Sequence, residues 1–255
     1  MNVLCIGDVV GTPGVEQLRR CVPTLRRQLD VQAVIVNAEN ADKSGTGLTR
    51  RLAEELLLGG FADVLTTGNH CFRRSDSSLY EECPQVLCPA NFPGLPLTCG
   101  RCTLDLGRVQ LEVYNLQGTA FLEALQNPFL LLDELLRTST ARLRILDFHA
   151  EATAEKKAMG FYADGRLSAV FGTHTHVQTA DEQILPQGTG YITDVGMTGP
   201  SLSVLGVRPE NAVQRQMRHI PTRFEVAEGP CVLEGVLFTL EEATGRCTAV
   251  QRIRR

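Results

Sequence analysis

Short apolar runs rich in β-branched residues alternate with stretches of helical periodicity along most of this chain. Residues 3–6, 33–36 and 143–146 have the length and composition of buried strands. Between the first two runs, apolar residues recur at three- and four-residue spacing, which predicts a helix that Pro13 opens and that extends to Leu29. Strands that alternate with helices are typical of an α/β fold.

Polar residues and turn residues mark several further elements. Thr49 is placed to cap a helix that Gly59 ends, and Asn127 and Pro128 begin another. Alternation on both sides of residues 107–108 predicts a β-hairpin. Three alternating runs near the C-terminal end predict antiparallel strands that complete a second sheet, at 222–227, 231–240 and 246–253.

The segment near 82–104 departs from this pattern because prolines interrupt it repeatedly. We expect a single domain over residues 1–255, in which this segment forms a small subdomain or an interface insertion. Cys99 and Cys102 form a lone CxxC motif within it. A structural zinc site would need a second suitably spaced pair, so we do not expect one here.

Composition narrows the class of protein. Hydrophobic residues make up 43% of the 255 residues and charged residues 21%, as in ordinary globular proteins. The net charge of −4 gives no overall attraction to nucleic acid or a membrane, although a local basic groove stays open. No apolar run approaches the roughly 18 residues that span a membrane. With no basic leader and an odd number of cysteines, nine, we expect a cytoplasmic protein with reduced thiols and no membrane partner.

Four of the five histidines lie at or just past the ends of predicted strands: His70, His149, His174 and His176. The carboxyl ends of strands are where α/β sheets place their ligands. In extended backbone, His174 and His176 would point to opposite sides, which suits two neighbouring metal ions better than one. Each histidine alone could be an ordinary hydrogen-bonded loop residue, but four in such positions favour a common site.

Carboxylates and amides follow other strands in the same way: Asp8, Glu39, Asn40 and Asn69. With the imidazoles they form the ligand chemistry of Mn or Fe pairs, and no thiolate is present. Two such ions lower the pKa of a bridging water and stabilise an in-line displacement at phosphorus. Asp8 is also placed to cap the helix that follows it. Residues 44–47 could line an anion pocket, although no Lys follows to make a P-loop.

The order of these motifs resembles that of a known family, the calcineurin-like metallophosphoesterases. The motifs that carry this resemblance are Gly7-Asp8, Gly68-Asn69-His70, His149 and Gly172-x-His174-x-His176. Longer stretches resemble the bacterial YmdB branch of the family, and they lie at 37–40, 147–153, 172–181 and 192–199. The resemblance covers nearly the whole chain. It implies a four-layer α/β/β/α sandwich of two mixed sheets flanked by helices, with residues 1–255 as one metallophosphoesterase domain.

The resemblance also implies roles for the residues at the strand ends. One divalent ion, Fe or Mn, would be held by Asp8, Glu39, Asn40 and His176, and a second by Glu39, Asn69, His149 and His174. His70 would be the general acid, with its ring turned away from the metals by alternation along its loop. The reaction would be hydrolysis of a phosphodiester, in particular a 2′,3′-cyclic nucleotide, by metal-activated hydroxide.

The chain departs from the branch pattern at two positions, where Arg73 replaces a common Asp and Ala154 replaces a usual Ser. Val10 agrees with the branch, which lacks the histidine of the first motif. Two other functions stay open. The chain could bind a nucleotide as a regulatory protein with little turnover, or it could be a phosphomonoesterase or nucleotidase. We expect no nucleic-acid partner, and a homo-oligomer stays open.

Overall fold

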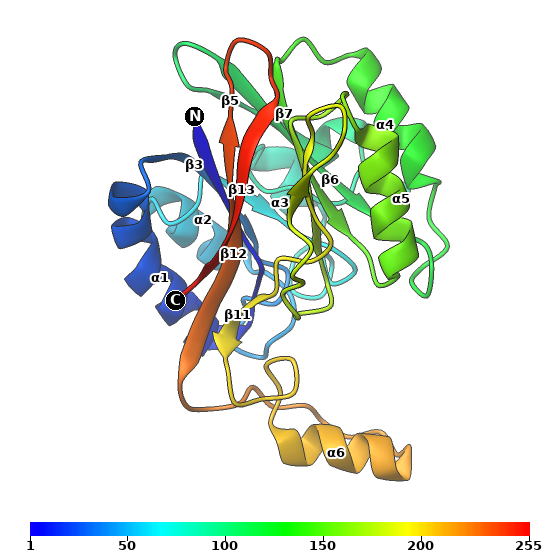
Figure 1. The fold of residues 1–255 in the computed structure, drawn as a ribbon. Coiled ribbons are helices and arrows are strands. Elements are labelled where there is room, and N and C mark those ends of the chain that lie inside the picture. The colour runs from blue at the N-terminus through cyan, green and yellow to red at the C-terminus, as the bar shows by residue number, and fades with distance from the viewer.

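The computed structural model describes residues 1–255, in which two β-sheets lie face to face and helices cover their outer faces (Figure 1). Side chains of β1 (Asn2–Ile6) alternate between the two faces of the first sheet, and both faces are buried. Val3 and Cys5 belong to the core between the sheets, whereas Leu4 and Ile6 belong to the core beneath the helices. The predicted α/β/β/α order of layers is confirmed.

The first sheet has the strand order β2-β11-β12-β1-β3-β4, with β13 paired to β12. Its parallel centre is formed by β1, β3 (Val31–Asn37) and β4 (Val64–Thr66). β12 (Cys231–Leu240) is antiparallel to β1. The remaining strands of this sheet are β2 (Asp8–Val9), β11 (Met197–Pro200) and β13 (Cys247–Arg254).

The second sheet has the order β5-β6-β7-β8-β10-β9. Its four central strands are parallel, namely β6 (Gln110–Gln117), β7 (Leu143–His149), β8 (Ala169–Thr173) and β10 (Gly190–Ile192). The edge strands are antiparallel to their neighbours, namely β5 (Arg101–Asp105) and β9 (Gln183–Ile184). The pairing of β5 with β6 confirms the predicted hairpin, and Gly107 supplies the positive φ that its turn needs.

The helices pack on the outer faces of the two sheets. α1 (Gly11–Gln28) and α2 (Arg50–Leu58) cover the first sheet, and α4 (Pro128–Arg137) and α5 (Thr153–Ala163) cover the second. The predicted caps are confirmed, because Thr49 accepts from Leu52 N at 3.3 Å and Asn127 accepts from Phe129 N at 2.9 Å. No helix is long and apolar enough to cross a membrane.

Three shorter features complete the chain. α3 (Ser77–Glu82) and the 3₁₀ helix η1 (Leu97–Gly100) lie in the connection between β4 and β5. The segment between β11 and β12, residues 201–230, forms an arm that carries α6 (Pro209–Arg218). α6 projects away from both sheets, and sequence periodicity did not predict it (Figure 1). Within 82–104, Val86 and Cys88 pack in the core under the helices, while Leu87 packs between the sheets. Its role as a subdomain or interface stays a prediction.

Three expectations are corrected. The runs at 231–240 and 246–253 are strands, but they join the first sheet through β1 and complete no second one. The run at 222–227 is no strand and makes a single bridge, at Val226. Alternation reports a strand with one buried face and cannot say which sheet it joins. Asp8 does not cap α1, because the cap position is Val10 and no side chain caps that helix.

Candidate metal centre

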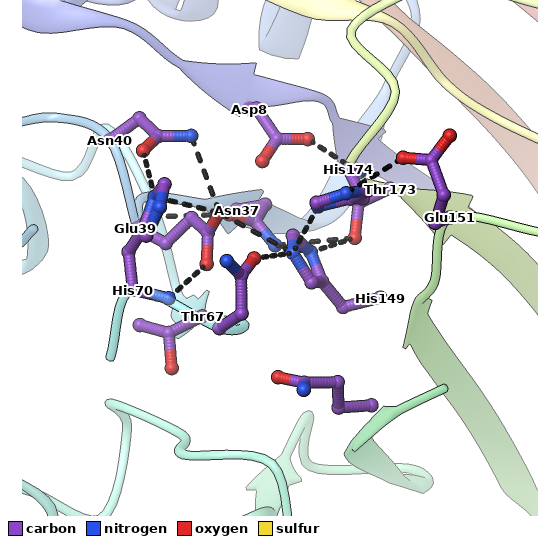
Figure 2. Close-up of polar contacts among 12 residues, drawn as sticks. Asp8, Asn37, Glu39, Asn40, Thr67, His70, His149, Glu151, Thr173 and His174 are labelled. Atoms are coloured by element: carbon purple, nitrogen blue, oxygen red, sulfur yellow. Dashed lines mark hydrogen bonds and ion pairs between the residues drawn. The ribbon is translucent and has the colours of Figure 1, made fainter. Parts of the chain in front are cut away.

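The polar residues predicted at the strand ends converge on one place, at the carboxyl ends of the parallel strands of both sheets. Figure 2 labels six of them: Asp8, Glu39, Asn40, His70, His149 and His174. Asp8 follows β1, Glu39 and Asn40 follow β3, and the pair Asn69-His70 follows β4. From the second sheet come His149, which is the last residue of β7 and lies within the strand, and the pair His174 and His176 after β8. The structure therefore brings together all eight predicted residues.

His149 is the centre of the first cluster. Its Nε2 lies 3.0 Å from Asn69 Oδ1, 3.0 Å from His174 Nδ1 and 3.3 Å from Glu39 Oε1. Ligand atoms of Glu39, His149 and His174 all lie within 4.8 Å of one another. These three residues form a candidate metal site.

The hydrogen bonds behind His149 fix its tautomer. Thr173 Oγ1 donates its single proton to Asp147 Oδ1 at 2.7 Å, so it accepts from His149 Nδ1 at 2.9 Å. In the neutral ring, Nε2 then carries a lone pair that faces the oxygens of Asn69 and Glu39. Lone pairs that converge on one point need a cation or a proton between them, and a buried imidazole held by a second hydrogen bond is the usual form of a metal ligand.

The charges in the cluster favour a cation. Burial by itself lowers the pKa of His149, but Glu39, Asp8 and Asp147 outweigh it and raise that pKa to about 9. Burial would raise the pKa of Asp8, yet His176 and His149 hold it well below its usual range. The pKa of Glu39 is lowered in the same way, chiefly by His149 against the effect of burial. Both carboxylates are therefore ionised and buried beside imidazoles.

A second cluster lies next to the first. His176 Nε2 is 3.7 Å from Asp8 Oδ1 and 3.3 Å from Asn40 Nδ2, and its Nδ1 is 3.0 Å from the carbonyl of Leu205. Asp8 Oδ1 is buried and has no hydrogen-bond partner. An orphaned buried carboxylate oxygen is costly unless a cation balances it. Together with the oxygen and imidazole donors, it fits a second divalent ion of the Mn or Fe class.

The loop that carries the two histidines is not extended, contrary to the expectation from the sequence. His174 has φ 101 and His176 has φ 62, both in the left-handed region. Hydrogen bonds hold this strained backbone, with Asp8 accepting from His174 N at 3.1 Å and Asp194 accepting from Thr175 N at 3.1 Å. The two imidazoles do reach two different clusters, but the turn directs them there and strand alternation does not.

His70 does not turn away from the cluster, as alternation along its loop had suggested. Residues 69 and 70 form a turn, and His70 Nδ1 lies 2.8 Å from Asn40 Oδ1 and 3.5 Å from Glu39 Oε1. Its backbone N–H donates to Glu39 Oε2 at 3.1 Å. Its Nε2 has no hydrogen-bond partner, and the ring is half-buried at the edge of the cavity described next.

A cavity of about 310 Å³ opens over both clusters. One wall contains Ser44, Gly45 and Thr46, so the predicted loop does line the site. Other lining residues come from the segment between β11 and β12 and are apolar, among them Leu205, Val207, Phe224 and Val226. No pattern along the chain had indicated that this arm reaches the site.

Sequence reasoning also missed the residues that support the ligands. Asp147 accepts from Asn37 Nδ2 at 3.1 Å and from Thr66 Oγ1 and Thr173 Oγ1. Glu151 Oε2 lies 2.9 Å from His174 Nε2. The sequence did contain a signal for these residues, because they lie inside or beside the same strand-end segments as the candidate ligands.

Comparisons with known proteins concern the whole chain and its fold. A family model described as YmdB-like protein matches residues 4–253. The 2′,3′-cyclic-nucleotide 2′-phosphodiesterase of Bacillus subtilis is 44% identical, covering 99% of this chain and 96% of that relative. A hypothetical protein from Thermus thermophilus has a similar crystal structure, with a TM-score of 0.93, 38% identity and coverage of 100% and 99% of the two chains. A novel phosphatase from Mycoplasma pneumoniae has a TM-score of 0.93, 34% identity and coverage of 100% and 93%.

Proposed function

This chain belongs to the family of YmdB-like proteins and is a phosphoesterase by homology, and we propose that it is a di-metal phosphodiesterase that hydrolyses 2′,3′-cyclic nucleotides. One observation carries the proposal. Buried ligand atoms of Asn69, Glu39 and His149 converge on one point that needs a positive charge between them, and Asp8 Oδ1 is orphaned beside them. The substrate class is supported by the relative in Bacillus subtilis.

Seven side chains would hold two divalent ions, Fe or Mn. The first ion would be held by Asp8, Glu39, Asn40 and His176, and the second by Glu39, Asn69, His149 and His174. When bound, the ions would polarise the phosphoryl group and activate water for in-line attack. Glu39 would bridge them, since it is the carboxylate whose contacts extend to His149 in one cluster and Asn40 in the other.

His70 would donate the proton to the departing oxygen. Its ring is held by Asn40 and is accessible at the edge of the cavity, with Nε2 unpartnered. Asn40 Oδ1 accepts from His70 Nδ1 here, which favours the doubly protonated ring and leaves its second N–H, on Nε2, for the leaving group.

The apolar wall of the cavity would receive the nucleoside. Phe224 is 49% exposed and lines the cavity with Leu205 and Val207. Any nucleobase can stack on such a ring, because every base has an aromatic face. The charged metal centre and the apolar wall together suit a substrate with a phosphate at one end and a base at the other.

The decisive experiment compares three substrates on metal-loaded protein, namely 2′,3′-cyclic AMP, a nitrophenyl phosphodiester and a nucleoside monophosphate. We expect turnover of both diesters, the highest kcat/KM for the cyclic nucleotide, and little turnover of the monoester. Faster hydrolysis of the monoester would support a nucleotidase. Tight binding of the cyclic nucleotide with no turnover would support a regulatory protein instead.

A further inference from the structure

A second and larger cavity, of about 670 Å³, lies at the opposite ends of the same strands. Four segments line it, from the amino-terminal ends of β7 and β8, the turn between β9 and β10, and the turn between β12 and β13. β7 begins with Leu143 beside this cavity and ends with His149 in the metal centre. At about 3.3 Å per residue, roughly 20 Å separate the two ends.

The charge of this cavity is strongly one-sided. Arg142, Arg144, Arg166 and Arg246 line it, and none of its 14 lining residues is Asp or Glu. Arg166 forms an ion pair with Asp133, but the other three arginines have no carboxylate partner. In a chain of net charge −4, three unpaired guanidinium groups around one concavity repel one another unless an anion lies between them.

Two of these arginines are held in place by backbone carbonyls. Arg142 Nη1 donates to Ala243 O at 2.7 Å, and Arg144 Nε donates to Ala141 O at 2.7 Å. Each guanidinium keeps further N–H groups free for a ligand, because it has five donors. A guanidinium that is already oriented loses little conformational freedom when it binds an anion.

The turns around the cavity are also fixed. The Arg246 side chain packs over Gly188, where an added Cβ would lie 3.0 Å from Arg246 Cγ and where φ is +102. The buried Asp164 accepts from Gln187 N at 2.9 Å and from Thr189 N at 3.3 Å. Asp164, which directly precedes the lining residues 165–168, is thus bound to backbone N–H groups and forms no ion pair with the arginines.

We propose that this cavity, the arginine pocket, binds a diphosphate or triphosphate group. Guanidinium groups match phosphate oxygens in charge and in hydrogen-bond geometry. No aromatic side chain lines the pocket, so it offers a base no surface for stacking. Its volume lies in the range of small-molecule sites, and a single concavity differs from the extended basic stripe that a nucleic acid backbone follows.

The test is titration calorimetry of the full chain with inorganic pyrophosphate and, separately, with ATP. We expect the double variant Arg142→Ala/Arg246→Ala to bind pyrophosphate at least about tenfold more weakly than the parent chain, since charge-assisted hydrogen bonds are lost. The matched control is Arg108→Ala, which removes an exposed arginine at the β5–β6 turn, outside the pocket. Measurements in the Glu39→Ala background remove any contribution of bound metal ions.

The outcomes separate the possible ligands. Equal affinity for pyrophosphate and ATP, lost together in the double variant, would show that the phosphates alone are recognised. Tighter binding of ATP with the same loss would assign a nucleotide source. Pyrophosphate binding that the double variant leaves unchanged would overturn the proposal, and so would arginine-dependent binding of single-stranded RNA but not of pyrophosphate. Unfolding temperatures without ligand show that the variants fold, and Arg246→Lys should retain part of the affinity.

Discussion

Strands β7 and β8 end in a cluster built for cations and begin at a pocket lined with arginines, and the two ends hold their side chains differently. At the metal centre, His149 and Glu39 are almost completely buried, and hydrogen bonds fix the direction of their donor atoms. At the other end, Arg142 and Arg246 are exposed, and only part of each side chain is held.

This difference separates two kinds of electrostatic site. Buried donors act in a low dielectric, where one misplaced or protonated atom changes the affinity for a cation steeply. Exposed guanidinium groups act through their summed charge, which salt screens. The metal centre should therefore respond to single atoms, and the arginine pocket to the number of charges and to ionic strength.

The largest expected effect comes from removing the bridging carboxylate. Glu39→Ala should empty both metal positions and abolish turnover, because Glu39 contacts both clusters. His176→Ala should weaken mainly one position, since Asp8 and Asn40 are the only proposed ligands that His176 contacts. Elemental analysis and turnover of 2′,3′-cyclic AMP measure both effects. Equal partial loss of metal in the two variants would contradict the assignment of Glu39 as the bridge.

The next effect concerns His70, which lies at the metal centre but is no proposed ligand. His70→Ala should keep its metal ions and lose about 10²–10⁴-fold in rate on 2′,3′-cyclic AMP, as general-acid removal typically does. The loss should be much smaller on a nitrophenyl phosphodiester, whose leaving group hardly needs a proton. Equal losses on both substrates at full metal content would exclude the role of leaving-group acid, and loss of metal would make His70 a ligand.

A smaller effect tests whether one hydroxyl proton sets the metal affinity. Thr173→Val removes the group through which Asp147 fixes the tautomer of His149, and it should weaken metal binding about 10–100-fold. Thr173→Ser is the matched control, because it keeps the hydroxyl and should retain the affinity. Metal competition assays give the values. If the Thr173→Val and Thr173→Ser variants bind metal with equal affinity, the hydrogen bond does not orient His149.

Substitution of Phe224 tests whether the apolar wall of the metal-centre cavity binds the base, a surface that the arginine pocket lacks. Phe224→Ala should raise KM for 2′,3′-cyclic AMP about fivefold or more, since a stacked base contributes about 1–3 kcal/mol. The kcat should change little, and Phe224→Tyr should restore KM. A cyclic phosphate diester without a base serves as the control substrate. A rise in its KM equal to that of the nucleotide would show that Phe224 shapes the cavity without contacting a base.

The smallest effect is that of salt, and it compares the two ends directly. Dialysis against about 1 M NaCl, where the Debye length is about 3 Å, should leave the metal content unchanged because the ligands are buried. Pyrophosphate binding by the arginine pocket should weaken several-fold under the same conditions. Calorimetry and elemental analysis on one sample series report both. Pyrophosphate binding that does not depend on salt would show that the arginine pocket does not act through exposed charges, contrary to the difference from the metal centre that we expect.

Local sequence patterns were enough to predict most of the helices and strands and the strand ends at which the candidate ligands lie. Thr49 and Asn127 could be recognised as caps because a cap contacts a backbone N–H two or three residues away. The residues from Asp8 to His176 could be grouped in advance because parallel strands bring their carboxyl ends together. The layer order and the ligand sets came from the resemblance to a family and not from periodicity.

Contacts between segments far apart in the chain became visible only in the folded molecule. Three features depend on such contacts: the place of β12 beside β1, the hydrogen bonds from His149 to Thr173 and from Thr173 to Asp147, and the left-handed turns at His174 and His176. The same holds for the arginine pocket, whose arginines are separated by up to about a hundred residues in sequence. Spacing along a chain records which side chains share an element, whereas pairing between distant segments depends on how whole surfaces pack.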